Sequence, residues 1–214
     1  MKIRLMAMAA VVVGLSGCGT LYYGAMEKMG VHKRDIMIDR VKDARATQSQ
    51  AKQQFLTAME QFKSVVRVQG GDLEKAYNRF SESLRRSEAA ASDVRTRIQS
   101  VEDVSEALFS EWRSEIRQYS SAALKAASQQ KYDATRRKYG ELISAMKLAE
   151  SKLEPALIPL RDQVLFMKHN LNARAIAGLS DELVTVQSNV DQLIRDMESA
   201  ITQADAFIAS LQAE

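Results

Sequence analysis

Apolar residues along most of the chain recur at alternating spacings of four and three, the seven-residue repeat of helices that pack side by side. The longest such stretch runs from Asp72 to about Ser128 and contains neither proline nor glycine. At about 1.5 Å per residue, this helix would be on the order of 80 Å long. The pattern therefore predicts a rod. Its repeat positions are Phe80, Leu84, Ser87, Ala91, Val94, Ile98, Val101, Ser105, Leu108 and Trp112.

A first helix is predicted upstream, from Asp35 to about Gln69. The Gly70-Gly71 pair ends it, since glycine adopts the backbone conformation of a helix terminus, and Asp72 caps the next helix. So short a connection forces an antiparallel hairpin. The repeat positions of this helix are Met37, Val41, Ala44, Gln48, Ala51, Phe55, Ala58, Phe62 and Val65.

Two more helices complete the pattern. The third is predicted from Tyr132 or Asp133 to Leu171, and the last from Leu179 to Leu211, with acids at Asp181 and Glu182 in its first turn. Both prolines of the chain, Pro155 and Pro159, fall in the third helix. Each removes a backbone hydrogen bond, so a kink is expected there, in preference to a full break because the apolar spacing continues beyond them.

Together these stretches predict an all-α protein, an elongated antiparallel helical bundle or coiled coil of about four long helices over residues 35–214. Runs of alternating Val- and Ile-rich strand with turn dipeptides are missing, which argues against a sheet. Such long apolar seams also pair between chains, so a homodimer is a further expectation.

Charge does not point to nucleic acid. The chain carries 30 Lys and Arg against 27 Asp and Glu, and Lys and Arg alternate with acids along the helices. Such alternation is typical of the solvated face of a bundle. No basic run exceeds three residues, so no nucleic-acid partner is predicted.

Residues 1–17 have the form of a secretory signal peptide, with Lys2 and Arg4 before an apolar run from Leu5 to Leu15 that is too short to span a bilayer. The run ends in Leu15-Ser16-Gly17-Cys18, which resembles the lipobox of bacterial lipoproteins. The resemblance implies cleavage before Cys18 and attachment of acyl chains such as palmitate to it. The alternative is an unlipidated secreted protein with a free thiol.

Residues 18–34 would then form a lipidated cysteine and a short juxtamembrane segment. Gly19 follows the cysteine, and the aspartate that retains many such proteins in the inner membrane is absent, so the periplasmic face of the outer membrane is the expected location. Aromatic and basic side chains of this segment are candidates for contact with lipid headgroups, although packing on the base of the bundle is an equal alternative. They are Tyr22, Tyr23, His32, Lys33 and Arg34.

Five segments resemble a family of Gram-negative envelope proteins known only as a domain of unknown function. The resemblance covers nearly all of the mature chain and implies an envelope location, but it supplies no catalytic residue. The segments are Tyr22–Glu27, Val31–Asp35, Gly70–Lys75, Leu108–Trp112 and Asp162–Asn172.

Candidate chemistry is sparse. His32 and His169 are the only histidines, and neither has a histidine or cysteine at metal-ligand spacing. Gly70-Gly71 lacks the Lys-Ser/Thr of a phosphate loop. No catalytic residue, metal or cofactor is predicted, and an enzyme is the third of three hypotheses.

A polar cluster near the end of the third helix is the most unusual segment of the bundle. Cations at a helix C-terminus complement the dipole and Asn suits a cap, so capping is one interpretation. A partner-contact patch is the other. The cluster comprises Lys168, His169, Asn170, Asn172 and Arg174.

The leading hypothesis is a non-catalytic, lipid-anchored periplasmic scaffold or adaptor for envelope proteins. The second is a helical rod that binds or shapes the membrane directly. Neither the partner nor the pathway can be named from the sequence.

Overall fold

The computed structural model describes residues 32–68, 72–171 and 173–213. Within these ranges every element is helical and no strand occurs, which confirms the all-α prediction. The helices are α2 (Lys33–Arg67), α3 (Leu73–Gln118), α4 (Ala122–Ser151), α5 (Leu153–His169) and α6 (Ala173–Gln212).

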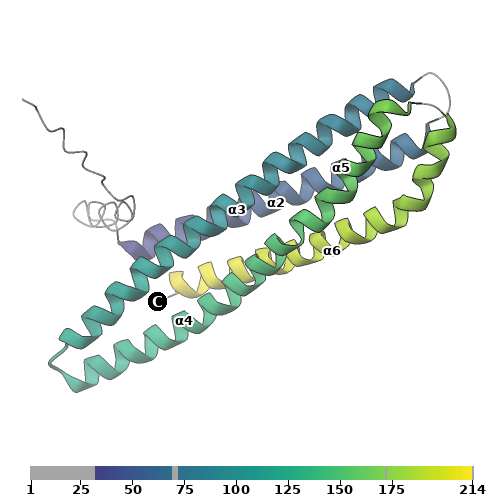
Figure 1. Ribbon diagram of the computed structural model, residues 1–214. Coiled ribbons are helices and arrows are strands. Elements are labelled where there is room, and N and C mark those ends of the chain that lie inside the picture. The colour runs from purple at the N-terminus through teal and green to yellow at the C-terminus, as the bar shows by residue number, and fades with distance from the viewer. Residues whose placement is uncertain (1–31, 69–71, 172, 214) are drawn as a thin grey trace, which may run out of the picture.

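These helices form an elongated bundle with four antiparallel arms, because α4 and α5 follow one another as a single arm (Figure 1). The α2 arm packs between α3 and α6, and the α4–α5 arm closes the ring by packing against the same two helices. The predicted antiparallel bundle is confirmed.

The seven-residue repeats identify the core. All nine repeat positions of α2 are buried, and the rings of Phe62 and Phe80 stack across the first hairpin with their centroids 5.3 Å apart. Each large apolar side chain buried in this way stabilises the bundle by about 1.5–3 kcal/mol. The fully buried large side chains include Phe55, Phe62, Phe80, Phe207, Met37, Ile98, Leu142, Met146, Leu153, Leu157, Leu160 and Met167.

The longest helix is shorter than the sequence indicates, because α3 ends at Gln118 and does not continue to Ser128. Tyr119 is extended, and Ser121 caps α4 by accepting a hydrogen bond from the Leu124 N–H at 3.4 Å. The chain thus reverses without glycine or proline, since a serine side chain satisfies one of the free amides of a helix start. As a result α4 begins at Ala122, ten residues before the predicted Tyr132.

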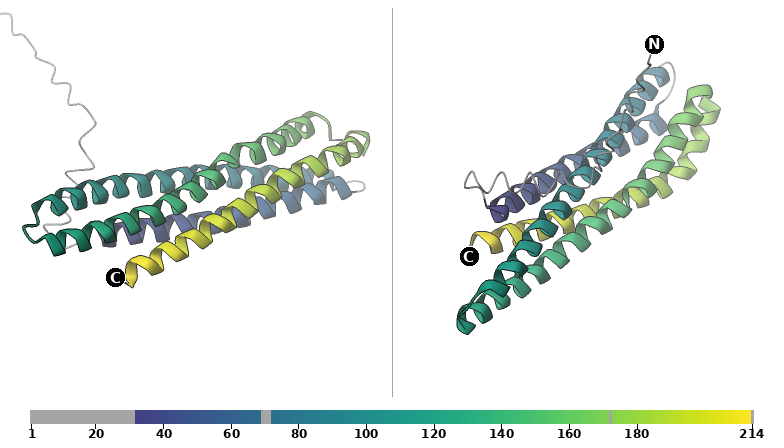
Figure 2. Two further views of the ribbon diagram at one scale, coloured as in Figure 1. Left: turned by 90° about the horizontal axis from the view of Figure 1, so that it is seen from below. Right: turned by 60° about the vertical axis from the view of Figure 1, so that its left-hand side comes forward.

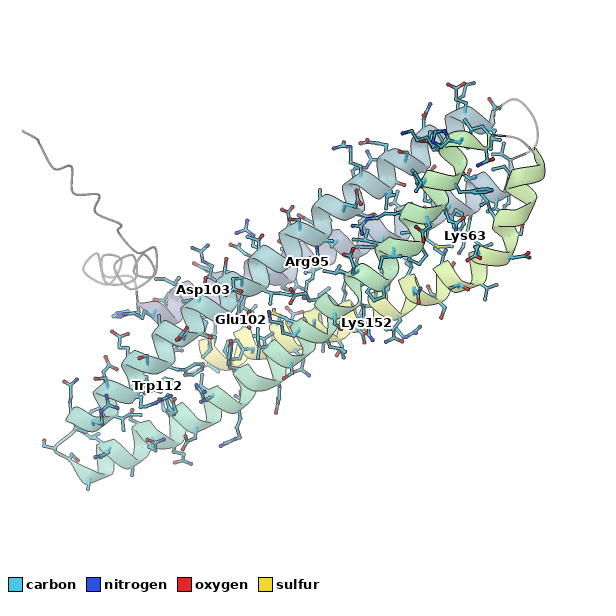
Figure 3. All side chains as sticks on the ribbon, in the orientation of Figure 1. Lys63, Arg95, Glu102, Asp103, Trp112 and Lys152 are labelled. Atoms are coloured by element: carbon cyan, nitrogen blue, oxygen red, sulfur yellow. The ribbon has the colours of Figure 1, made fainter. Side chains whose placement is uncertain are left out.

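Beyond the ends of α2 and α6, α3 and α4 continue as a two-helix extension (Figures 1 and 2). It has a small core of its own, in which Phe109, Ile116 and Tyr132 are buried and Trp112 and Tyr139 are partly buried. The Nε1–H of Trp112, which is labelled in Figure 3, donates to Ser128 Oγ across the two helices at 3.0 Å.

The two prolines produce one short interruption. Lys152 is the single turn residue between α4 and α5, at the position labelled in Figure 3, and its backbone stays in the right-handed helical region with φ −92° and ψ −8°. Pro155 has no N–H for the carbonyl of Ser151, so the ladder resumes with the Ala156 N–H bonding to the Lys152 carbonyl at 3.2 Å. The helix runs through Pro159 without a second interruption.

The last helix begins at Ala173, six residues before the predicted Leu179. Gly178 lies inside this helix, where a glycine lowers helix stability by only about 1 kcal/mol. Ile176 is buried in the core, so its packing extends the helix upstream of the glycine. Consequently Asp181 and Glu182 are not in the first turn, and their predicted role at the helix start is wrong.

Candidate interaction surface

The N-terminal candidates fall partly outside the structure. Cys18, Tyr22 and Tyr23 lie outside the described residues. His32 is exposed at the N-cap position of α2.

Two of the basic candidates are bonded within the protein. The Lys33 ammonium lies 2.9 Å from Glu111 Oε1 on α3, and the Arg34 guanidinium donates to the carbonyl of Leu211 at the end of α6. These contacts fasten the start of α2 to both neighbouring helices. Contact of this segment with lipid stays a prediction.

The polar cluster at the end of α5 has the geometry of a helix cap. The Asn170 backbone N–H donates to the Met167 carbonyl at 3.1 Å, and its side-chain Nδ2 donates to the Phe166 carbonyl at 2.9 Å. Lys168 and His169 are exposed in the last turn, where positive charge complements the dipole.

The remaining two members of this cluster are separated from the others by the turn into α6. Asn172 lies outside the described residues. Arg174 belongs to α6, and its side chain is not among those the structure describes.

Next to this cap, the outward side of α5 carries large apolar side chains. Ile158 is 49% exposed, Leu165 is 63% exposed and Phe166 is 44% exposed. Ile158 and Leu165 are seven residues apart, about two helical turns, so they point the same way, roughly opposite the buried Leu160. We call Ile158, Leu165 and Phe166 the outer apolar face of α5.

Two further apolar side chains are exposed before and after α5. Leu148 in the last turns of α4 and Leu171 after α5 are each more than a third exposed. Lys152, Lys168 and His169 flank the face and are at least partly exposed. An apolar centre with a polar rim is the usual composition of a protein-binding surface.

Ion pairs hold α5 in place behind this face. Arg161 lies 2.6 Å from Glu88 on α3 and also pairs with Glu154, which in turn lies 3.0 Å from Arg95 on α3. The hydrogen bond from Arg161 lowers the pKa of Glu154 below its usual value. The network therefore joins the first turns of α5 to α3 while the carboxylates are ionised.

Sequence reasoning did not identify the outer apolar face. The apolar spacing that continues past the prolines runs through Leu157, Leu160, Val164 and Met167, and Ile158 and Leu165 each fall one position after a member of that repeat. A second apolar stripe at a spacing of seven was the available signal, because a surface helix ordinarily has only one.

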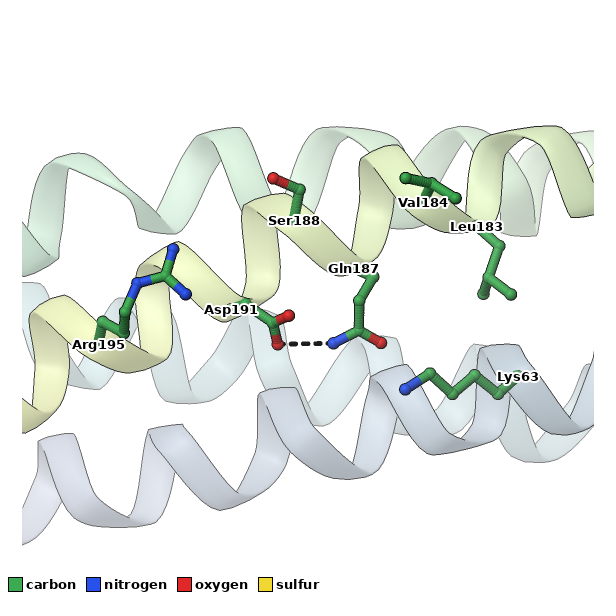
Figure 4. A pocket seen from close by; sticks show the side chains of 7 residues that line it. All are labelled: Lys63, Leu183, Val184, Gln187, Ser188, Asp191 and Arg195. Carbon is green, nitrogen blue, oxygen red and sulfur yellow. Dashed lines mark hydrogen bonds between the residues drawn. The ribbon is translucent and has the colours of Figure 1, made fainter.

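The described surface has shallow, open grooves. One of about 400 Å³ lies between α2 and α6, where Gln187 Nε2 donates to Asp191 Oδ1 at 2.6 Å and Lys63 runs along α2 opposite them (Figure 4). Its lining residues are Lys63, Leu183, Val184, Gln187, Ser188, Asp191 and Arg195.

The two histidines are far apart. His32 precedes α2, and His169 ends α5 at the opposite end of the bundle (Figure 1). Among the described residues, no three His, Cys, Asp or Glu side chains gather as a metal site would require. No described helix has the length and apolar character needed to cross a bilayer.

The fold and surface together define an elongated antiparallel helical-bundle protein with an exposed apolar helix face. The chain belongs to the family described as "Protein of unknown function (DUF2959)", whose model matches residues 22–211, nearly the whole of the described bundle. No curated protein matches the chain. Because the family carries no assigned activity, function has to be argued from the surface.

Proposed function

We propose that this protein is a lipid-anchored, non-catalytic scaffold or adaptor of a Gram-negative cell envelope. It is held at the periplasmic face of the outer membrane through Cys18. Its bundle binds another envelope protein through the outer apolar face of α5.

The observation that carries this proposal is the exposure of that face. Ile158, Leu165 and Phe166 stand on a helix fixed by the Arg161 ion pairs and by a buried inner side. Large apolar side chains on a rigid helix are efficient anchors for a partner, because little conformational freedom is lost on binding. An amphipathic helix or a shallow apolar groove is the partner surface that such a stripe fits.

The anchor is supported by the sequence around Cys18. Lys33 follows Cys18 by fifteen positions, a reach of at most about 50 Å when fully extended. Two or more acyl chains give stable attachment, since each buried methylene contributes about 0.8 kcal/mol. The bundle would therefore stay close to its membrane.

The alternative function, a rod lying with its side on the bilayer, is less well supported. It relies on cations beside the anchor, and Lys33 and Arg34 are already bonded to Glu111 and to the end of α6. To bind lipid, either side chain would first have to break its bond within the protein, which costs free energy.

The test is a site-specific photocross-link in intact cells with the full-length protein. A photoreactive amino acid at Leu165 is expected to give one discrete adduct with another envelope protein. The matched control is the same amino acid at Val184 on α6, which is 75% exposed, and there the adduct should be absent. Phe166→Glu should abolish the Leu165 adduct, and Cys18→Ala should reduce it.

Three results would overturn the adaptor role. They are no adduct at Leu165, the same adducts at both positions, and an adduct containing only this chain. The last would indicate a homodimer.

A further inference from the structure

The end of the two-helix extension has a larger net positive charge than the whole chain. Residues 113–138, which we call the tip, contain seven Lys and Arg and two acids, a net charge of +5, whereas the whole chain carries +3. Between Ile116 and Tyr132 there is no acid at all. The cations are Arg113, Arg117, Lys125, Lys131, Arg136, Arg137 and Lys138.

These cations are presented to solvent. All seven are exposed, and none forms an ion pair with another described residue. Two of them contact the small aromatic core instead: Arg113 donates to the Tyr132 hydroxyl at 2.9 Å, and the Arg136 guanidinium lies 5.4 Å from the centre of the Phe109 ring. The charges of Arg117, Lys125 and Lys131 are therefore available to a binding partner outside the chain.

Apolar side chains are exposed among these charges. Tyr119 is 42% exposed and Leu124 is 58% exposed, on either side of the turn that joins α3 to α4. The first turns of α4 otherwise present alanines to solvent at positions 122, 123, 126 and 127. A tyrosine and a leucine at the end of a cationic hairpin combine the two features that bind the interfacial region of a bilayer.

The tip also lies at the end of the bundle where the described chain begins. The Lys33–Glu111 pair fixes the start of α2 beside α3. Tyr119 is eight residues beyond Glu111, about 12 Å farther along the helix. The start of α2 and the tip therefore share one end of the molecule, and His169 lies at the other (Figures 1 and 2).

We infer that the tip docks on an anionic lipid surface. Tyr119 and Leu124 enter the interface, and Arg117, Lys125 and Lys131 meet the headgroup phosphates. The end-on orientation rests on the proposed anchor at Cys18, which would place residues 18–32 between the membrane and this end of the bundle. The charge and exposure of the tip are independent of it.

The experiment measures whether the tip enters the bilayer interface. Cys18→Ala removes the only cysteine, so a polarity-sensitive fluorophore can be attached at Leu124→Cys in the full chain, with Val184→Cys as the matched control label at the other end of the bundle. With vesicles containing phosphatidylglycerol, the emission at position 124 should shift to the blue and that at position 184 should not. Vesicles of phosphatidylcholine alone should give little shift at either.

Variants that remove charge, and added salt, then distinguish lipid docking from other causes of an emission shift. Each cation near an anionic surface contributes about 1 kcal/mol, roughly fivefold in affinity, so Arg117→Gln with Lys125→Gln and Lys131→Gln should weaken the position-124 response on the order of 100-fold. Raising the salt should weaken it as well. Circular dichroism of each variant checks that the bundle is still folded.

An absent shift at position 124, an equal shift at both positions, or insensitivity to charge would overturn the inference. Because Cys18 is absent throughout, the outcome does not depend on lipidation. It is equally independent of the α5 partner, which is tested separately at Leu165.

Discussion

Gln48 is a polar residue placed in an apolar seam. It occupies a repeat position of α2 and is fully buried, and neither amide atom bonds to any described group. An unpaired buried amide costs about 1–3 kcal/mol. A single polar residue at such a position disfavours other registers of the seam, as it does in coiled coils. Gln48 is therefore expected to lower the stability of the bundle.

Replacing Gln48 by leucine should therefore stabilise the bundle. The expected gain in the free energy of unfolding is about 1–3 kcal/mol, because a side chain of similar volume removes the unpaired amide. Urea unfolding followed by circular dichroism measures it. Gln50→Leu, at an exposed position of the same helix, should change the free energy by less than about 0.5 kcal/mol. A loss of stability in Gln48→Leu would show that the amide is satisfied in solution.

At the scale of elements, the seven-residue repeats were sufficient to predict which side of a helix faces the core. Every repeat position predicted for α2 is buried. A repeat of 3.5 residues places the apolar side chains on one side of a helix, and neighbouring helices cover that side. In α3 the prediction holds through Ser105 and then fails at Leu108, where Phe109 and Ile116 become the buried positions. Near that point the neighbours of α3 change, since α2 begins beside Glu111 and only α4 accompanies α3 farther on.

The ends of helices were harder to predict than their faces. The turn at Ser121 uses a serine cap in a sequence without glycine or proline, and the start of α6 is set by the burial of Ile176. A single serine is a weak local signal for a turn, and the burial of Ile176 is a tertiary effect that the local pattern does not show. The same limit applies to the interaction surface: Lys168 and His169 were identified, whereas Leu165 was not, because its exposure depends on which side of α5 meets α3 and α6.

The α5 element is joined to α3 by a carboxylate network that depends on pH. The folded pKa of Glu154 is lowered, so its contribution to stability is present above the unfolded pKa of about 4.5 and is lost as the pH falls through the folded pKa. Its side chain is about half exposed, which limits the contribution to less than about 1 kcal/mol.

Glu154→Gln should accordingly destabilise the protein by less than about 1 kcal/mol at pH 7 and by less at pH 3 than at pH 7. Urea unfolding of both proteins at the two pH values measures the difference. Glu141→Gln on α4, an exposed acid that forms no ion pair with the described residues, should have no effect at either pH. An equal loss at both pH values would mean that the substitution acts through packing and not through charge.

The whole molecule consists of a four-arm section and a two-helix extension. The four-arm section buries the large core, whereas the extension has only Phe109, Ile116 and Tyr132 fully inside. Fewer buried contacts make a segment open at lower free energy. The extension should therefore open locally while the rest of the bundle stays folded.

Phe109→Ala tests this division. Truncating a buried phenylalanine costs about 3–5 kcal/mol, and here the loss should fall on the extension, because Phe109 packs on Tyr132 and Tyr139 there. Hydrogen exchange read by mass spectrometry should rise across residues 110–135 and stay unchanged around Phe55 and Phe62. Uniformly faster exchange would show that the two sections unfold as one.

The account depends most on the attachment of the rod to a membrane. The direct measurement is the intact mass of the full-length gene product extracted from its own membranes with detergent, followed by sequencing of its N-terminal peptide. A mature chain that begins at Cys18 and carries acyl chains, recovered from the outer-membrane fraction, is the predicted result. A chain that keeps residues 1–17, or one that begins at Cys18 with an unmodified thiol, would contradict the anchored scaffold.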